Sequence, residues 1–182
     1  MIDPTSEKTE GYHLFLEPFG EAATLLSSAV QSLSAEYGGP IFTPHLTLLA
    51  TIPETNEQEL IDASRVLASS LAPLTFTLAG FGAEETYFRT LYMTVQNEGE
   101  IAEYHARSRA VFGGVDGQPY VPHVSLLYGM YDPWRKQRSI ASLAYLVPTV
   151  CEVSSLSLWH TPGDTSTWRR IGEFEFGPHT RA

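Results

Sequence analysis

An eight-residue segment that occurs twice is the feature that most constrains how this chain can fold. FTPHLTLL at residues 42–49 and YVPHVSLL at residues 120–127 agree in residue type at every position: aromatic, β-branched, proline, histidine, aliphatic, hydroxyl, leucine and leucine. Each copy follows a helix-like segment that ends at a pair of glycines. A repeat of this kind is typical of a chain built from similar units, and we expect two similar halves that face each other.

The segments around the two copies predict an α+β fold with antiparallel sheets. Helical or alternating spacing of apolar residues, with glycine and proline stops, separates helices from strands. The expected strands are 12–18, 45–52, 74–81, 86–95, 120–129, 149–159 and 166–176. The expected helices are 21–37, 55–71, 100–112 and about 133–144. Adjacent strand pairs occur beside the alternation of strands and helices, and this mixture favours the α+β class.

Two of the expected helices begin at a recognisable cap. Thr55, with Gln58 three residues later, fits a capping box, and Asp132 before Pro133 fits an N-cap followed by proline in the first turn. These signals place the helix starts at residues 55 and 133.

Length and composition indicate one ordinary globular unit. The 182 residues suit a single bilobal domain over 1–182, and 43% apolar with 18% charged residues is typical of a folded protein. Eleven lysines and arginines against 21 acids give a formal net charge of −10. A long polyanion such as duplex nucleic acid is repelled on average by such a chain. A small ligand with one phosphate remains possible, because local donors outweigh distant charge.

The sequence contains no signal for a membrane, a disulfide or a metal centre. No apolar run approaches the ~20 residues of a membrane span, and the start lacks a secretory pattern, so we expect a cytoplasmic monomer. Cys151 is the single cysteine, which excludes an internal disulfide and a thiolate metal cluster. No histidine pair has zinc-site spacing, and no glycine-rich phosphate loop is present. We therefore expect no metal and no cofactor.

The repeated motif can perform acid–base chemistry. Residues two apart on a strand point to the same face, so His45 lies beside Thr47, and His123 beside Ser125. The proline before each histidine suits the start of a strand. Of two histidines across one cleft, one accepts a proton while the other donates one near neutral pH. The hydroxyls can bind phosphate oxygens. This set of groups, at 45–48 and 123–126, fits metal-independent hydrolysis of a phosphodiester.

Histidines outside the motifs carry weaker predictions. His13 shares a strand face with Phe15 and could line the cleft, although a partly exposed strand histidine is the more ordinary interpretation. His105 lies near Arg107 and Arg109 on an expected helix, a pattern typical of a solvated face.

The wider motifs, GGPIFTPHLTLLA and QPYVPHVSLLYG, resemble the two-histidine (2H) phosphoesterase superfamily, and in particular its cyclic phosphodiesterase branch, known from plants and fungi. The resemblance implies a bilobal fold in which two antiparallel sheets flank a central cleft, with helices outside and a pseudo-twofold axis between the lobes. It also implies hydrolysis of 2′,3′-cyclic nucleotides to nucleoside 2′-phosphates, or of ADP-ribose 1″,2″-cyclic phosphate to ADP-ribose 1″-phosphate. The substrate would be a small nucleotide.

The resemblance carries over to individual positions. The motif residues that match the catalytic ones are His45, Thr47, His123 and Ser125. Tyr128 matches a position near the substrate, Phe15 stands where plant relatives have a tryptophan at the cleft, and Tyr87 falls in a stretch that supplies another aromatic wall. As a working assignment, His123 activates water and His45 protonates the leaving ribose oxygen.

Two other functions stay open at this stage. A related enzyme could act on the 2′,3′-cyclic end of RNA or join RNA ends through a 2′-5′ bond, although the net charge argues mildly against a long RNA. A non-catalytic nucleotide-binding module is the other alternative, but both histidines and both hydroxyls are present.

Overall fold

The computed structural model describes residues 9–53, 55–113 and 119–178. This part of the chain forms eight strands, four α-helices and two short 3₁₀ turns. The strands are β1 (Tyr12–Leu16), β2 (Leu46–Ile52), β3 (Leu74–Gly82), β4 (Leu91–Gln96), β5 (His123–Leu127), β6 (Thr149–Val153), β7 (Ser155–His160) and β8 (Arg169–Glu175). The helices are α1 (Gly20–Tyr37), α2 (Glu57–Ser69), α3 (Gly99–Phe112) and α4 (Pro133–Ser142), and the turns are η1 (Ala144–Leu146) and η2 (Thr165–Thr167).

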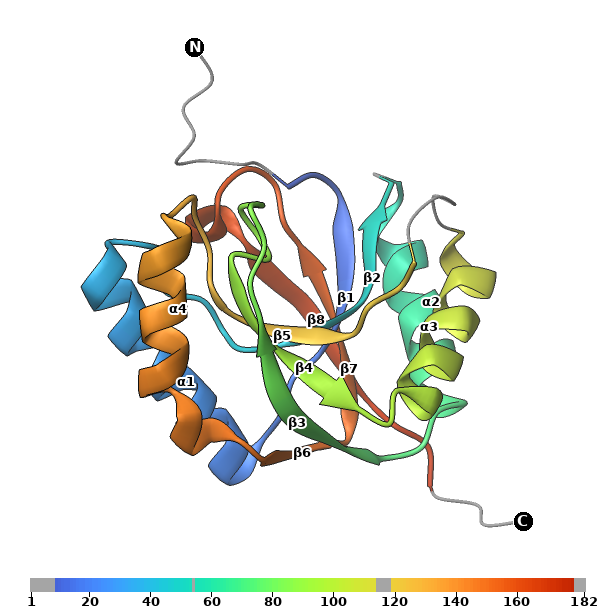
Figure 1. The fold of residues 1–182 in the computed structure, drawn as a ribbon. Helices are drawn as coiled ribbons and strands as arrows, with labels where there is room; N and C mark the ends of the chain where they lie inside the picture. The colour runs from blue at the N-terminus through green and yellow to red at the C-terminus, as the bar shows by residue number, and fades with distance from the viewer. Residues whose placement is uncertain (1–8, 54, 114–118, 179–182) are drawn as a thin grey trace.

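One curled antiparallel sheet contains all eight strands, in the order β6-β3-β4-β5-β2-β1-β7-β8 (Figure 1). It consists of two four-stranded halves, β6-β3-β4-β5 and β2-β1-β7-β8, and each half contributes its motif strand to the centre. A single Cα pair, Leu46 with Val124, joins β2 to β5; we call it the junction pair. The predicted α+β bilobal fold is confirmed, and the two predicted sheets are halves of one continuous sheet.

The two halves share a pseudo-symmetric strand pairing. β1 pairs with β2 so that Phe15 lies opposite Thr47. β4 pairs with β5 so that Tyr92 lies opposite Ser125. In both halves, an aromatic residue of the strand on the outer side of the motif strand therefore lies opposite the motif hydroxyl.

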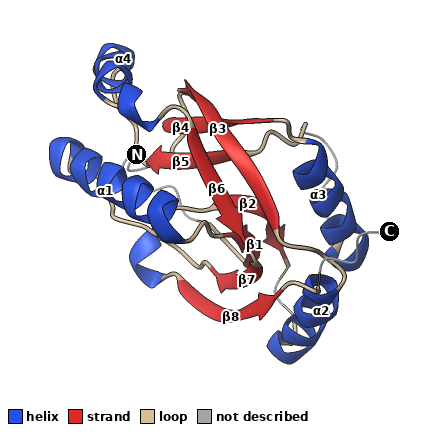
Figure 2. Ribbon diagram, turned by 90° about the horizontal axis from the view of Figure 1, so that it is seen from below, coloured by secondary structure: helices blue, strands red, loops and turns tan. Residues whose placement is uncertain are grey.

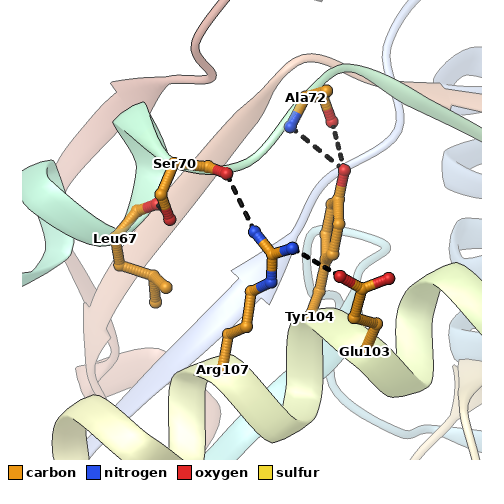
Figure 3. A network of polar contacts seen from close by, with 6 residues as sticks. All are labelled: Leu67, Ser70, Ala72, Glu103, Tyr104 and Arg107. Atoms are coloured by element: carbon orange, nitrogen blue, oxygen red, sulfur yellow. Dashed lines mark hydrogen bonds and ion pairs between the residues drawn. The ribbon is translucent and has the colours of Figure 1, made fainter. Parts of the chain in front are cut away.

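Helices cover the outer sides of the sheet in two pairs (Figures 1 and 2). α1 packs on β5 and β6, and α4 lies on the same side of the molecule. On the opposite side, α2 packs on β7 and β8 while α3 packs on β2. Polar contacts tie α3 to the end of α2: the Arg107 guanidinium bonds Glu103 and the Ser70 carbonyl, and the Tyr104 hydroxyl bonds the backbone of Ala72 (Figure 3). Among the described helices, none combines the length and apolar character of a bilayer span.

The apolar core lies between these helices and the sheet. Strand alternation sends Leu46 and Leu48 of the first motif, and Val124 and Leu126 of the second, to the same core, where all four are fully buried. The apolar stripe of α1 packs into the core with Leu26, Ala29, Val30 and Leu33. The histidines and hydroxyls between the motif leucines are thereby directed to the other face.

Three sequence predictions about element boundaries are wrong. The expected strand 149–159 is two strands, because the chain leaves the β3 edge after Val153 and crosses at Ser154 to the other half, where β7 pairs with β1 and β8. Of the expected strand 86–95, only the part from Leu91 onward is extended in the sheet. The N-cap of α2 is Asn56 instead of Thr55: its side chain accepts a hydrogen bond from the Gln58 N–H at 3.0 Å.

The junction pair should be a stability determinant. Leu46→Ala removes a fully buried side chain at the one point where the halves pair, so we expect a loss of about 2–5 kcal/mol in the free energy of unfolding. Leu25→Ala on the exposed side of α1 is the matched control and should cost less than about 1 kcal/mol. Urea denaturation measures both. If both substitutions lower the free energy of unfolding equally, the junction pair is not part of the continuous core.

Candidate active site

The junction pair brings the two motifs together. Because β2 and β5 are antiparallel, continuing the register by one residue on either side places His45 beside Ser125 and Thr47 beside His123. Side chains directly opposite each other have Cβ atoms about 4.5–5.5 Å apart, and diagonal neighbours lie roughly 7–8 Å apart. The two histidines are thus diagonal neighbours on one face, each with the hydroxyl of the other motif at its side.

Both imidazoles are fixed by the same local hydrogen bond. His45 Nδ1 lies 2.7 Å from the Thr43 carbonyl, and His123 Nδ1 lies 2.8 Å from the Val121 carbonyl. A carbonyl can only accept, so Nδ1 carries the proton and donates in each ring, which leaves Nε2 as the acceptor of the neutral form. The proline between carbonyl and histidine has a fixed φ and holds this two-residue loop. The carbonyl two residues before each histidine therefore sets the tautomer of that ring.

His45 is enclosed by aromatic rings. It is 6% exposed, its ring stacks on Phe15 at 3.7 Å, and the Trp168 ring lies 6.4 Å away. Burial lowers the pKa of His45 to about 4, against the opposing effect of the Thr43 carbonyl. Its Nε2 lies 3.5 Å from the Tyr128 hydroxyl. The free protein therefore holds His45 neutral at pH 7.

His123 lies in a more open setting. Its ring meets the Tyr92 ring edge-on at 5.0 Å. Burial lowers the pKa of His123, the Val121 carbonyl raises it, and the positive charge of Arg89 lowers it again. This histidine also lines the larger of the two cavities described below, so water can reach it more easily than it reaches His45.

The two hydroxyls differ in what they bind. Ser125 Oγ donates to the Phe88 carbonyl at 2.8 Å, which ties β5 to the segment between β3 and β4. Within the described residues, the Thr47 hydroxyl has no hydrogen-bond partner. Thr47 can therefore donate to a ligand oxygen at once, whereas Ser125 must exchange its partner to do so.

Two cavities open at opposite ends of this group of four side chains. A cavity of about 200 Å³, the aromatic cavity, borders His45 and is lined by Phe15, Ile41, Phe42, Thr43, Trp159, Thr165 and Trp168. A cavity of about 470 Å³, the cationic cavity, borders His123 and Thr47 and contains Arg89, His105 and Arg109 among its lining residues. A ligand bridging the histidines would have space on both sides.

The aromatic residues expected near the substrate take different positions. Phe15 stacks on His45 and lines the aromatic cavity. Tyr128 is buried against His45, with its ring stacked on Phe42 at 3.8 Å. Tyr87 lies one layer behind: it is 5% exposed, its ring is 6.3 Å from that of Tyr128, and it lines neither cavity.

Sequence reasoning missed two aromatic residues of the site. Phe42 is the first residue of the first motif, and an aromatic residue, Tyr120, begins the second motif as well. This repetition could have indicated that Phe42 lies at the site. Trp168 was assigned to a strand, but it follows η2 in the connection between β7 and β8, with its ring 6.3 Å from Phe15 and 6.2 Å from Tyr128. Nothing local in the sequence indicates that this connection reaches the site.

The other histidine predictions need correction. His13 is 7% exposed and lies inside the sheet, where Nδ1 meets the Thr161 hydroxyl at 2.8 Å and Nε2 accepts from the Thr51 N–H. His105 does not belong to a solvated face: its ring stacks on Tyr120 at 3.8 Å. Among the described residues, no group of three or more His, Cys, Asp or Glu is arranged to hold a metal ion.

Fold and site together define a class of protein: an α+β domain in which two strands of a pseudo-symmetric sheet each present a histidine and a hydroxyl to one site. The profile of the 2′-5′ RNA ligase superfamily matches residues 24–165, a stretch that includes both motifs. The chain therefore belongs to this superfamily, the two-histidine phosphoesterases, and the family resemblance of the sequence is confirmed.

Individual relatives agree with this membership. A cyclic phosphodiesterase of Arabidopsis thaliana is 25% identical over 124 residues, which are 66% of this chain and 66% of that protein, just under two thirds of its length. The structure of TT0787 of Thermus thermophilus has a TM-score of 0.60 at 18% identity, covering 92% of this chain and 98% of that one. Apo LigT of E. coli has a TM-score of 0.58 at 13% identity, covering 94% and 99%. The structural likenesses show the fold.

The buried imidazoles should make stability depend on pH. The pKa values of His13 and His45 are lowered from 6.5 to about 4, by burial in both cases. Between these values the unfolded chain binds more protons, so stability is fully present above pH 6.5 and falls as the pH decreases towards 4. At pH 5, His13 alone accounts for about 2 kcal/mol of the loss relative to pH 7.

Denaturation of the wild type and of His13→Asn at pH 7 and pH 5 tests this linkage. Asparagine keeps a donor for Thr161 but does not titrate, so the variant should lose less stability than the wild type on acidification. An identical loss in both proteins would exclude His13 as a titrating group in this range.

Proposed function

We propose that this protein hydrolyses a cyclic phosphodiester of a small nucleotide without a metal. The substrate would be a 2′,3′-cyclic nucleotide, opened to the nucleoside 2′-phosphate, or ADP-ribose 1″,2″-cyclic phosphate, opened to ADP-ribose 1″-phosphate. The observation that carries the proposal is the diagonal pair of histidines, both held as Nδ1–H tautomers, with a motif hydroxyl beside each. This arrangement supplies one proton acceptor, one proton donor and two ligands for phosphate oxygens.

The reaction balances with these groups alone. A water oxygen attacks phosphorus and transfers its proton to Nε2 of one histidine, while the bond from phosphorus to the 3′-oxygen breaks and that oxygen takes a proton from the other histidine. The Thr47 and Ser125 hydroxyls would bind the non-bridging oxygens, where charge develops. The Tyr128 hydroxyl lies 3.5 Å from His45 Nε2. It is therefore close enough to orient a substrate oxygen that bonds to this nitrogen.

The environments of the histidines support His123 as the base and His45 as the acid. His123 borders the larger, cationic cavity, whereas His45 is 6% exposed and borders the smaller, aromatic cavity. Attack by water is therefore easier to accommodate at His123. A His45 that is neutral in the free protein needs the negative charge of the bound phosphodiester to take up a proton. Once protonated, an imidazole with a low pKa is a strong donor to a leaving alkoxide.

Substitution of the motif histidines tests these roles. His45→Ala and His123→Ala should each lower kcat on 2′,3′-cyclic AMP by about 10²–10⁴-fold, while His160→Ala, which lines neither cavity, should stay near the wild-type rate. In a substrate with sulfur in place of the 3′-oxygen, the leaving group departs as a thiolate and needs no proton. This substrate should therefore restore turnover to the acid variant, His45→Ala, and leave His123→Ala inactive. If the sulfur substrate restored turnover to His123→Ala instead, His123 would be the acid and His45 the base.

Two observations support a small nucleotide as the substrate. The curated Arabidopsis relative is a cyclic phosphodiesterase, and E. coli LigT, which shares the fold, has been solved with 3′-AMP and with ATP. The net charge of −10 also disfavours a long polyanion. The superfamily's description as 2′-5′ RNA ligases favours a second candidate. This is an enzyme that joins RNA ends through a 2′-5′ bond, or a related one that acts on the 2′,3′-cyclic end of RNA.

A product assay separates these candidates. Protein treated with EDTA should convert 2′,3′-cyclic AMP to adenosine 2′-phosphate, at a kcat/KM that exceeds the value for an oligonucleotide ending in a 2′,3′-cyclic phosphate. Rates at low and high salt show whether distant phosphates contribute, because such contacts weaken with salt. A preference for the oligonucleotide would favour the RNA enzyme, a 3′-phosphate product would mean the opposite ring opening, and binding without turnover would leave a nucleotide-binding module.

A further inference from the structure

The cationic cavity is larger than the reacting phosphate requires. Its volume is about 470 Å³, and it begins at Thr47 and His123, directly beside the proposed reaction centre. From there it follows residues 48–51 of β2, beyond the junction pair, where β2 is no longer paired with β5. A substrate held between the histidines would therefore have a second compartment next to it.

The charge of this cavity is unusual for the chain. Acids outnumber lysines and arginines by 21 to 11 in the sequence, yet the described residues that line the cavity include two arginines, Arg89 and Arg109, and no carboxylate. The Glu84 carboxylate that pairs with Arg89 lies outside this lining. Two guanidinium groups at one cavity can attract a small anion even when the net charge of the protein is negative.

One wall of the cavity is built from two rings fixed to β2. His105 and Tyr120 stack in parallel, with centroids 3.8 Å apart and planes at 2°. His105 Nδ1 donates to the Leu48 carbonyl at 2.7 Å, and the Tyr120 hydroxyl donates to the Thr47 carbonyl at 3.0 Å. Because both rings are anchored, the wall is already formed before any ligand binds.

The two arginines approach from different elements. Arg109 lies on α3, one turn after His105, so the two side chains share a face of the helix. Arg89 comes from the segment between β3 and β4, where its guanidinium is ion-paired with Glu84. The Nε atom of Arg89 is buried and has no hydrogen-bond partner among the described residues. Arg89 therefore keeps a donor that the Glu84 pair does not use.

We propose that the cationic cavity binds a second phosphate group of the substrate, through Arg109 and Arg89. The proposal rests on the proposed function and makes it more specific: the preferred substrate is a small nucleotide that carries a phosphate or pyrophosphate in addition to the cyclic phosphodiester. The aromatic cavity at the His45 end, with Phe42 and Trp168, is the better place for a nucleobase, because an aromatic lining favours stacking. The two cavities then recognise different parts of one ligand.

Calorimetry with two product-like nucleotides tests this subsite without depending on turnover. The wild type should bind adenosine 2′,5′-bisphosphate at least about tenfold more tightly than adenosine 2′-phosphate, since charged hydrogen bonds to one phosphate supply that much affinity. In Arg109→Gln and in Arg89→Gln this preference should fall at least about fivefold. Rising KCl should weaken the wild-type preference as well.

Arg107→Gln is the matched control. Arg107 lies on the same helix two residues before Arg109, but its guanidinium bonds Glu103 and the Ser70 carbonyl at the α2 end (Figure 3), so its replacement should leave the preference unchanged within about twofold. Equal affinity of the wild type for the two nucleotides would overturn the subsite, whatever the variants show. A clear preference in a protein that has no phosphodiesterase activity would keep the subsite and reject the proposed function.

Discussion

The whole structure depends on the contact between β2 and β5. These strands meet at one Cα pair, so the sheet is continuous, but beyond the junction β2 and β5 are paired only with their other neighbours, β1 and β4. The cationic cavity opens along residues 47–51 of β2, where this strand has left β5, whereas the aromatic cavity lies at the other end of the junction, beside residues 41–45. A longer ladder between β2 and β5 would fill this space with backbone hydrogen bonds, whereas the loss of the junction pair would separate the halves and their histidines.

Strand alternation then divides the motif residues between stability and chemistry. The leucines and valine around each histidine are fully buried in the core, and their packing fixes the strands to which the histidines belong. The site has a cost in stability, because enclosed neutral imidazoles resist protonation and weaken the fold at acidic pH. Perturbed titration of this kind is common at functional sites.

The sequence was sufficient for the parts of the site that are encoded locally. The repeat placed two histidines and two hydroxyls on equivalent strands, and the alternation of the motif predicted which side chains enter the core. Residues brought in from distant segments could not be predicted in this way. Trp168 reaches the site through the β7–β8 connection, and the orientation of His105 and Arg109 depends on how α3 docks on β2. The crossing at Ser154 was missed because TVCEVSSLSLW is strand-like throughout, and only pairing partners from other segments decide where it divides.

The pseudo-symmetry of the backbone does not extend to the lining of the site. The aromatic residue that begins the first motif, Phe42, stacks on Tyr128 and helps to enclose His45, whereas its counterpart Tyr120 stacks on His105 and forms the wall of a cationic cavity. In the reaction proposed above, this difference would favour one histidine for attack by water and the other for departure of the alkoxide. Two similar halves provide the common geometry that places both rings on one face of the sheet. The unequal surroundings of those rings give the proposed reaction two different histidines and the proposed ligand two different cavities.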